Sequence, residues 1–174
     1  TSVPNQYRMA YSNYLIEEVA RIFNGNSYQM FAPQYVTSAE TRDVFMQEKS
    51  IKEVFDLARS ADIAIAGIGT LNENSALINA QMIPLEEYKR LQKLGGKGEL
   101  LSHILDKNGN LLNDQFEEHL IGLTLEDFKQ IPIRVGVACG LEKKEAILSV
   151  LRGGYVNVLI TDEKVANYLI EETK

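Results

Sequence analysis

The sequence predicts one domain of the α/β class, a Rossmann-like parallel sheet with helices on both faces. Its 174 residues suit a single domain, and 45% hydrophobic with 24% charged residues is typical of a globular chain. In the second half of the chain, short apolar segments alternate with amphipathic ones. Strand alternating with helix implies parallel strands, because each crossover helix returns the chain to the same end of the sheet.

Five segments are expected to form strands, because they are short, apolar and bounded by turn residues. The clearest is 61–67, ADIAIAG, in which the apolar residues are consecutive. Such a run is typical of a strand covered on both faces. The other expected strands are 28–31, 99–105, 133–138 and 156–160. Asn108 and Gly109 predict a hairpin turn, because both residue types tolerate positive φ.

Helices are expected where apolar residues recur at steps of three and four. In 8–23 these residues share one face, which we expect to lie on the sheet. In 50–60, Ser50 and Glu53 have the spacing of a capping box, which predicts that the helix begins there. The remaining expected helices are 38–47, 73–80, 84–94, 124–130, 142–151 and 162–170.

The composition excludes several functions for this segment. The 18 basic and 24 acidic residues give a formal net charge of −6, whereas nucleic-acid contacts need a basic patch. Cys139 is the only cysteine, which excludes an internal disulfide or a cysteine-rich zinc cluster and fits a reducing cytoplasm. No apolar run approaches the ~18 residues of a membrane span. The start, TSVPNQYRMA, has neither an initiator Met nor a signal-peptide pattern, so we expect a fragment of a longer protein.

Three expected strand ends carry residues that could bind an anion, namely 67–70, 138–143 and 161–162. Ligands of parallel sheets bind beyond the carboxyl ends of the strands. Glycines there let backbone N–H groups approach a phosphate, and the dipole of the following helix favours negative charge. A threonine hydroxyl and a lysine ammonium would complete the site. Ordinary turns between strand and helix explain the same stretches, so the spacing leaves both interpretations open.

Several of these stretches together carry a family resemblance. In chain order they are APQYV, ADIAIAGIGT, GGKGELLSHILDKNGNLL, IGLTLEDFKQIP and VACGLEKKEAILSVLRGGYVNVLITDEKVANYL. Over nearly the whole chain they resemble the effector-binding domain of SorC/DeoR-type bacterial sugar-responsive transcriptional regulators. The resemblance implies an effector-binding domain over 1–174, with a fold similar to that of sugar-phosphate isomerases, glucosamine-phosphate deaminases and CoA-transferases.

The resemblance also implies partners. The effector would be a phosphorylated sugar or polyol, no cofactor or metal is expected, and the protein would form homodimers or tetramers in the cytoplasm. DNA would bind through an N-terminal helix-turn-helix domain that is absent from this chain. The ligand-binding residues carried over from the family pattern are Gly67, Gly69, Thr70, Gly98, Glu99, Gly140 and Lys143.

The family pattern assigns a role to some of these residues. Its V-A-G-G-x-x-K motif falls on 137–143, which makes Gly140 and Lys143 phosphate contacts. Cys139 replaces the first glycine, which could alter the φ preference of the loop. A glycine-aspartate pair of the family falls on Gly98 and Glu99, so that the longer Glu99 would contact sugar hydroxyls.

Other readings of the same residues stay open. Lys143 and Lys144 lie in the first turn of an expected helix, where the dipole disfavours a cation unless an anion is present, but a solvated surface pair is equally compatible with the sequence. A sugar-phosphate isomerase or aminosugar-phosphate deaminase on this fold is the alternative function, with Glu73, Glu99 or Asp162 as base. A third possibility is an oligomerisation module without a small ligand. We expect no enzyme and assign no catalytic residue, because the two histidines and the cysteine show no recognisable spacing.

The segment 106–117 is not expected to bind calcium. Asp106, Asn108, Asn110 and Glu117 have the spacing of EF-hand ligands. The sixth loop position must be glycine for the sharp turn, and here it is Leu111.

Overall fold

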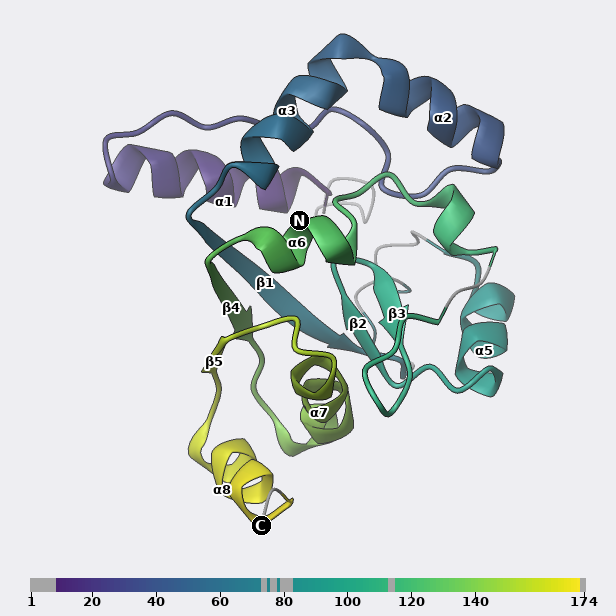
Figure 1. Cartoon of the computed structure of the whole chain (residues 1–174), viewed down its shortest axis with the longest axis vertical. Helices are drawn as coiled ribbons and strands as arrows, with labels where there is room; N and C mark the ends of the chain where they lie inside the picture. The colour runs from purple at the N-terminus through teal and green to yellow at the C-terminus, as the bar shows by residue number, and fades with distance from the viewer. Residues whose placement is uncertain (1–8, 73–74, 76–77, 79–82, 113–114, 173–174) are drawn as a thin grey trace, which may run out of the picture.

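The computed structural model describes residues 9–72, 75, 78, 83–112 and 115–172, and it centres on a five-stranded sheet of order β3-β2-β1-β4-β5 (Figure 1). The strands are β1 (Ile63–Thr70), β2 (Gly98–Leu100), β3 (His103–Leu105), β4 (Ile133–Val137) and β5 (Val158–Ile160). The helices are α1 (Met9–Ile22), α2 (Ala39–Gln47), α3 (Lys49–Arg59), α5 (Leu85–Lys93), α6 (Leu125–Gln130), α7 (Lys144–Arg152) and α8 (Glu163–Glu172), with short 3-10 turns η2 (Glu117–His119) and η3 (Leu141–Lys143). The α/β class is confirmed.

The sheet is mixed rather than wholly parallel. Strands β1, β4 and β5 are parallel neighbours, as predicted, and α7 connects β4 to β5. The single strand predicted over 99–105 is wrong: β2 and β3 form an antiparallel hairpin, and β2 pairs antiparallel with β1. The two strands are joined by only two residues, Leu101 and Ser102, and such a short connection can join only antiparallel strands.

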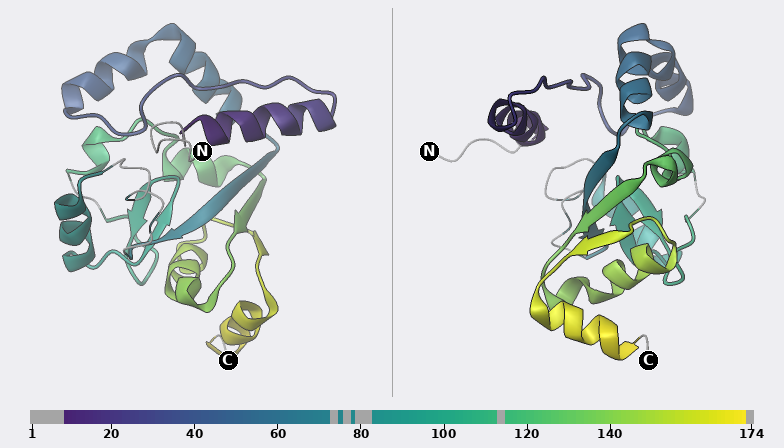
Figure 2. Two further views of the ribbon diagram at one scale, coloured as in Figure 1. Left: turned by 180° about the vertical axis from the view of Figure 1, so that it is seen from behind. Right: turned by 60° about the vertical axis from the view of Figure 1, so that its left-hand side comes forward.

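One face of the sheet is covered by α7 and contains the main hydrophobic core (Figure 2). Ile68 and Leu100 lie opposite each other in β1 and β2, and both are buried against residues of this helix, such as Ile147. The α6 residues Leu125 and Phe128 extend the same core. The amphipathic pattern of 142–151 therefore correctly predicted a helix that covers the sheet, although α7 begins two residues later.

The opposite face of the central strands is largely exposed among the described residues, although Val135, which lies opposite Ile65 in β4, is buried. Ile65 of β1 is 72% exposed, whereas Ile68 of the same strand is 1% exposed. Ile63, Ile133, Val158 and Ile160 are the other large exposed side chains of this face. The expectation of a strand covered on both faces is therefore wrong for the part of the chain described. A consecutive apolar run shows that both faces can be buried, but other elements must supply the cover.

The first helix stands away from the sheet (Figure 2, right). Its exposed side chains include Leu15, Val19 and Ile22, which form the apolar face that we expected to lie on the sheet, and Phe23 just beyond it is 79% exposed. The helix itself agrees with the prediction for 8–23 to within one residue at each end. Its packing does not agree, because no described element covers this apolar face.

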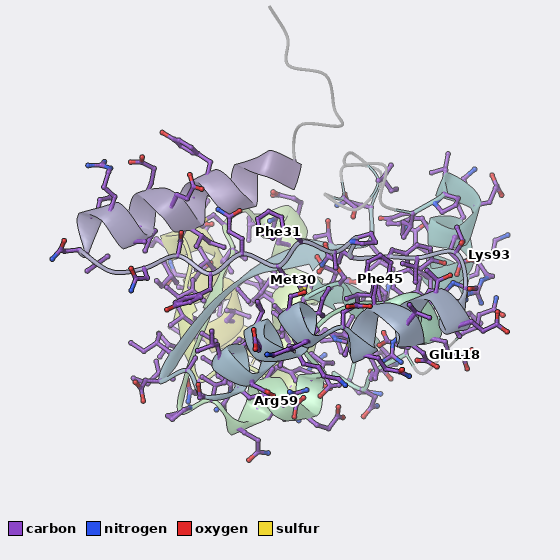
Figure 3. The ribbon with its side chains drawn as sticks, turned by 90° about the horizontal axis from the view of Figure 1, so that it is seen from above. Met30, Phe31, Phe45, Arg59, Lys93 and Glu118 are labelled. Atoms are coloured by element: carbon purple, nitrogen blue, oxygen red, sulfur yellow. The ribbon has the colours of Figure 1, made fainter. Side chains whose placement is uncertain are left out.

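A second layer is formed by α2 and α3 together with the segment that precedes them. Val36, Ile51 and Phe55 are buried there, with Met30 and Phe45 packed against them (Figure 3). No strand forms at 28–31, contrary to prediction, and Phe31 is 81% exposed. Aromatic residues favour strands only where a neighbouring strand can pair with them. The pairing occurs further along the chain, in a bridge between residues 35 and 120.

Three local predictions differ in detail. The capping box is absent, because α3 begins at Lys49, directly after Glu48, and Ser50 lies inside the helix. The 106–110 turn forms and brings Leu105 to Leu111, but only Gly109 has positive φ. The helix predicted over 73–80 falls mostly outside the described residues. Within the described residues, none of the helices combines the length and apolar character needed to cross a membrane.

Candidate functional site

The loops that follow β1 and β4 meet at the carboxyl edge of the sheet. The ammonium of Lys143, in η3, donates a hydrogen bond to the backbone carbonyl of Ile68 in β1, with Nζ 3.2 Å from the oxygen. The two strands are parallel neighbours, so their carboxyl ends lie at the same edge. The segments at 69–70 and 140–142 thus lie at one edge of the sheet, next to the Lys143 ammonium. The N–H of Gly140 is already bonded to Asp162, and the contact of any of these groups with a ligand stays a prediction.

Gly140 has a structural role in this edge. Its φ is +101°, and a Cβ there would collide with the carboxylate of Glu142. Its N–H donates to Asp162 Oδ2 at 2.7 Å, which ties the loop after β4 to the start of α8. Cys139 does not have positive φ. The replacement of the family's glycine at this position therefore causes no backbone strain.

Asp162 caps the start of α8 as well as binding Gly140. Its Oδ1 accepts from the N–H groups of Lys164 and Val165 at 3.0 and 3.1 Å. The N–H of Gly140, followed by that of Val165, keeps the pKa of this carboxyl below its usual range. A carboxylate that is stabilised in its charged form is a weak base, which makes Asp162 a poor candidate for proton abstraction. Glu73, another candidate base, lies outside the described residues.

Glu99 lies opposite Gly69 in the β1–β2 pair, and a Cβ on Gly69 would overlap the Glu99 carboxylate. Its Oε1 accepts a hydrogen bond from the N–H of Ser102 at 2.5 Å. Burial raises the pKa of Glu99, an effect that exceeds the opposing influence of Ser102 N–H, His103 and Lys143. Its carboxyl oxygens can accept hydrogen bonds from hydroxyl groups.

The remaining three predicted residues occupy different surroundings. Gly98 faces α7, where a Cβ would lie 3.0 Å from the carbonyl oxygen and 3.1 Å from the Cα of Ala146. Close packing of β2 on α7 therefore explains this glycine without a ligand. Gly67 is exposed, and a Cβ there would meet nothing within 4 Å, so no contact requires glycine at this position. Thr70, at the end of β1, lines a hollow in the surface.

That hollow, of ≈ 320 Å³, lies between the end of β1, the turn before β2 and the start of α7. Its lining residues are Thr70, Leu71, Asn72, Gln92, Gly96, Lys97, Leu141, Glu142, Lys144, Glu145 and Ala146. Lys97 forms an ion pair with Glu145 at 3.4 Å, and Lys144 lies over the ring of Tyr168. The sequence did not predict Lys97 as a lining residue, because it is not next to the end of a predicted parallel strand or the start of a predicted helix.

A second hollow, of ≈ 590 Å³, lies between the loops after β4 and β5. It is lined by residues 140–142 and 162–164. The third predicted strand end, 161–162, thus lies at the same carboxyl edge of the sheet as the loop after β4. Gly140 and Leu141 reach this hollow, and Leu141 also reaches the first one.

The two histidines have structural partners. Both ring nitrogens of His103 face oxygens: Nδ1 lies 2.6 Å from Glu117 Oε2, and Nε2 lies 2.9 Å from the carbonyl of Leu123. His119 is within hydrogen-bonding distance of the Val36 carbonyl and stacks on Tyr35. These contacts satisfy both ring nitrogens of His103. They give neither histidine the position of a catalytic base beside Cys139, which is exposed.

Comparison with known proteins places this geometry in a family. A family model described as "Putative sugar-binding domain" matches residues 2–171. The erythritol catabolism regulatory protein EryD of Brucella abortus is 36% identical over 144 residues, which cover 83% of this chain and 45% of that protein. The transcriptional regulator LsrR of Escherichia coli is 36% identical over 138 residues, 78% of this chain and 44% of that protein. The chain thus spans about half the length of these curated relatives.

Solved structures show the same architecture. A transcriptional regulator from Streptococcus pneumoniae has a TM-score of 0.85 and 31% identity, over 92% of this chain and 62% of that chain. The full-length sorbitol operon regulator SorC of Klebsiella pneumoniae has a TM-score of 0.84 and 26% identity, over 91% of this chain and 51% of that chain. The chain therefore belongs to the sugar-binding domain family of SorC/DeoR-type transcriptional regulators.

Proposed function

We propose that the domain binds a phosphorylated sugar or polyol at the carboxyl edge of β1 and β4, and that binding controls a DNA-binding segment elsewhere in the protein. Family membership supports a sugar-type effector. The observation that carries the position of the site is the Lys143 Nζ–Ile68 carbonyl bond, which brings a cation to the junction of the two glycine-containing loops. The cytoplasm as location, and assembly into dimers or tetramers, form part of the same proposal.

The site offers different chemistry to the two ends of such a ligand. Lys143 uses one N–H for Ile68, which leaves two donors for a phosphoryl group. Thr70 adds a hydroxyl at the same edge. Glu99 lies one strand further along the sheet, where it can hydrogen-bond sugar hydroxyls but would repel a phosphate if ionised. We therefore place the phosphoryl group at Lys143 and Thr70, and the carbon chain towards Glu99.

The regulatory step is a shift in population. An effector can change DNA binding only if it binds one arrangement of the loops or subunits better than another. The segments that we expect to respond are 67–75, which extends beyond the described residues, and 95–99, because they lie at the proposed site where β1 ends and β2 begins.

Calorimetry with D-sorbitol 6-phosphate, D-glucose 6-phosphate and their unphosphorylated counterparts tests the proposal. We expect heat of binding with at least one phosphorylated compound and much weaker binding of its counterpart. Lys143→Ala should weaken binding by roughly 10- to 100-fold, the usual effect of losing a hydrogen bond to a charged group. Lys144→Ala is the comparison variant: Lys144 lines the same hollow as Thr70, but its ammonium lies over Tyr168, so we expect a smaller loss of affinity than for Lys143→Ala.

Equal losses in the two lysine variants would contradict the proposed position of the phosphoryl group. Binding of the unphosphorylated compound as tightly as the phosphorylated one would contradict the assignment of the effector class. Turnover of a sugar phosphate during the same incubations would favour the isomerase or deaminase alternative.

A further inference from the structure

The turn between β2 and β3 is held in an unfavourable backbone conformation. Leu101 has φ of 54° and Ser102 has φ of 69°, and neither residue is glycine. Left-handed conformations cost free energy for residues that carry a Cβ, so two in succession persist only where their surroundings hold them. The conformation of this turn therefore depends on the contacts that hold it.

Two side-chain contacts hold Ser102. Its N–H donates to Glu99 Oε1 at 2.5 Å, and its hydroxyl accepts from the side-chain amide of Gln34 at 2.5 Å. Ser102 is buried. The first contact comes from a residue of the proposed effector site, and the second comes from a segment 68 positions earlier in the sequence.

We call residues 34–36, which lie between α1 and α2, the strap. Two backbone hydrogen bonds tie the strap to the end of η2 and the residues that follow it. The N–H of Ile121 donates to the carbonyl of Gln34 at 2.9 Å, and the N–H of Val36 donates to the carbonyl of His119 at 3.0 Å. It leads directly into α2, whose N-cap is Ser38. The side chain of Gln34 thus connects the layer of α2 and α3 to the β2–β3 turn.

We propose that Ser102 and Gln34 are positioning residues that couple Glu99 in the effector site to the strap. A ligand hydroxyl that takes the Glu99 carboxylate competes with the Ser102 N–H. Loss of that hydrogen bond lets the strained turn relax, and the Ser102 hydroxyl then moves relative to Gln34. Coupling is reciprocal, so the position of the strap also changes the affinity at Glu99. This inference rests on the proposed function, because it uses Glu99 as a ligand contact.

Amide hydrogen exchange in the full chain tests the coupling without any ligand. Glu99→Ala should speed exchange of the Ile121 amide about three- to tenfold, which corresponds to the loss of about one hydrogen bond's stabilisation. Glu99→Gln should restore it, because the amide oxygen still accepts from Ser102. In the opposite direction, Gln34→Met should speed exchange of the Ser102 amide by a similar factor.

Two controls separate coupling from general loss of stability. Gln29→Met removes another side-chain amide hydrogen bond, to Glu17, that lies outside the chain of contacts, and it should leave the Ser102 amide unchanged. The Leu112 amide, bonded to the Ile104 carbonyl at 2.7 Å, should keep its rate in every variant. Equal acceleration of all these amides would show a merely structural role and overturn the inference, as would no change at Ile121 in Glu99→Ala.

Exchange in the presence of D-sorbitol 6-phosphate separates the inference from the proposed function. Calorimetric binding with altered exchange at Ser102 and Ile121 supports both. Binding that leaves both amides unchanged overturns the coupling and leaves the proposed function intact. If no sugar phosphate binds, the proposed function fails and the ligand step of the inference fails with it, whereas the variants still decide whether Glu99 and the strap are coupled.

Discussion

The two faces of the central sheet both carry isoleucine side chains but differ in their cover. Ile65 and Ile68 belong to the same strand and are the same residue type, yet Ile68 is buried beneath α7 and Ile65 is exposed. The buried face owes its cover to chain connectivity, since α7 follows β4 almost directly and must return over the sheet to reach β5. No described element follows a comparable path over the other face. A pattern of hydrophobic residues thus indicates what can be buried, and connectivity determines what is.

The largest expected effect separates these two isoleucines. Ile68→Ala should lower the free energy of unfolding by about 2–5 kcal/mol, because it removes buried methyl groups and leaves a cavity. Ile65→Ala should change it by no more than about 0.5 kcal/mol, as for other surface substitutions. Urea denaturation measures both. Similar losses of stability in the two variants would mean that Ile65 is covered in solution. That result would contradict the difference in cover between the two faces.

The next effect concerns two glycines of the candidate site. Gly98→Ala should lower the free energy of unfolding by about 1–3 kcal/mol, because the new methyl group meets the backbone of Ala146 on the covered face. Gly67→Ala, on the open face, should be close to neutral. Thermal and urea unfolding of both variants provide the test. A neutral Gly98→Ala would show that β2 and α7 can separate slightly at no cost.

A buried charge gives a pH-dependent effect that we expect to be smaller. Burial lowers the pKa of His103, but the hydrogen bond and charge of Glu117 and the Leu123 carbonyl outweigh it, so the pKa is raised overall. The protonated form therefore stabilises the fold below the unfolded pKa of about 6.5, and this contribution is lost as pH rises through the folded pKa. Urea unfolding from pH 5.5 to 9 should show this decline, and His103→Gln should remove it. An unchanged slope in the variant would assign the decline to other groups.

The smallest effect is expected at the exposed edge. The pKa of Asp162 is lowered by its backbone hydrogen bonds, first that from Gly140, so its contribution is present above about pH 3.8 and is lost as pH falls through the folded pKa. Asp162→Asn should flatten the acid side of the stability profile slightly. Glu163→Gln, a neighbouring exposed carboxyl, is the control. Identical profiles for both variants would indicate that the Gly140 bond contributes nothing measurable in water.

The C-terminal half of the fold was predictable because each element there is short, strongly patterned and bounded by turns. The strand at 133–138 and the helices at 142–151 and 162–170 agree with β4, α7 and α8 to within about two residues. The β2–β3 turn was not predictable, because Leu101 and Ser102 are not turn-forming residues with positive φ. The side chains of Glu99 and Gln34 hold that turn by hydrogen bonds to Ser102. Neither bond follows from a local sequence pattern.

The candidate site divides in the same way. The convergence of 67–70 with 140–143 followed from parallel pairing, because the carboxyl ends of neighbouring parallel strands must meet. The sequence could not separate glycines required for packing, such as Gly98, from one such as Gly67 that no contact requires. It also could not reveal that Lys97 forms an ion pair with Glu145 at the start of α7. The two residues are 48 positions apart, and they meet only because β2 pairs antiparallel with β1.

By itself, the amino-acid sequence determined the α/β class, the parallel order of its C-terminal units and the family to which the domain belongs. These depend on periodicity and local turn chemistry, which are properties of neighbouring residues. Only the tertiary structure decided which face of the sheet is covered, that β2 runs antiparallel to β1, and that Glu99, Ser102 and Gln34 form one chain of contacts. Burial, and hydrogen bonds between distant segments, arise only when the whole chain is packed.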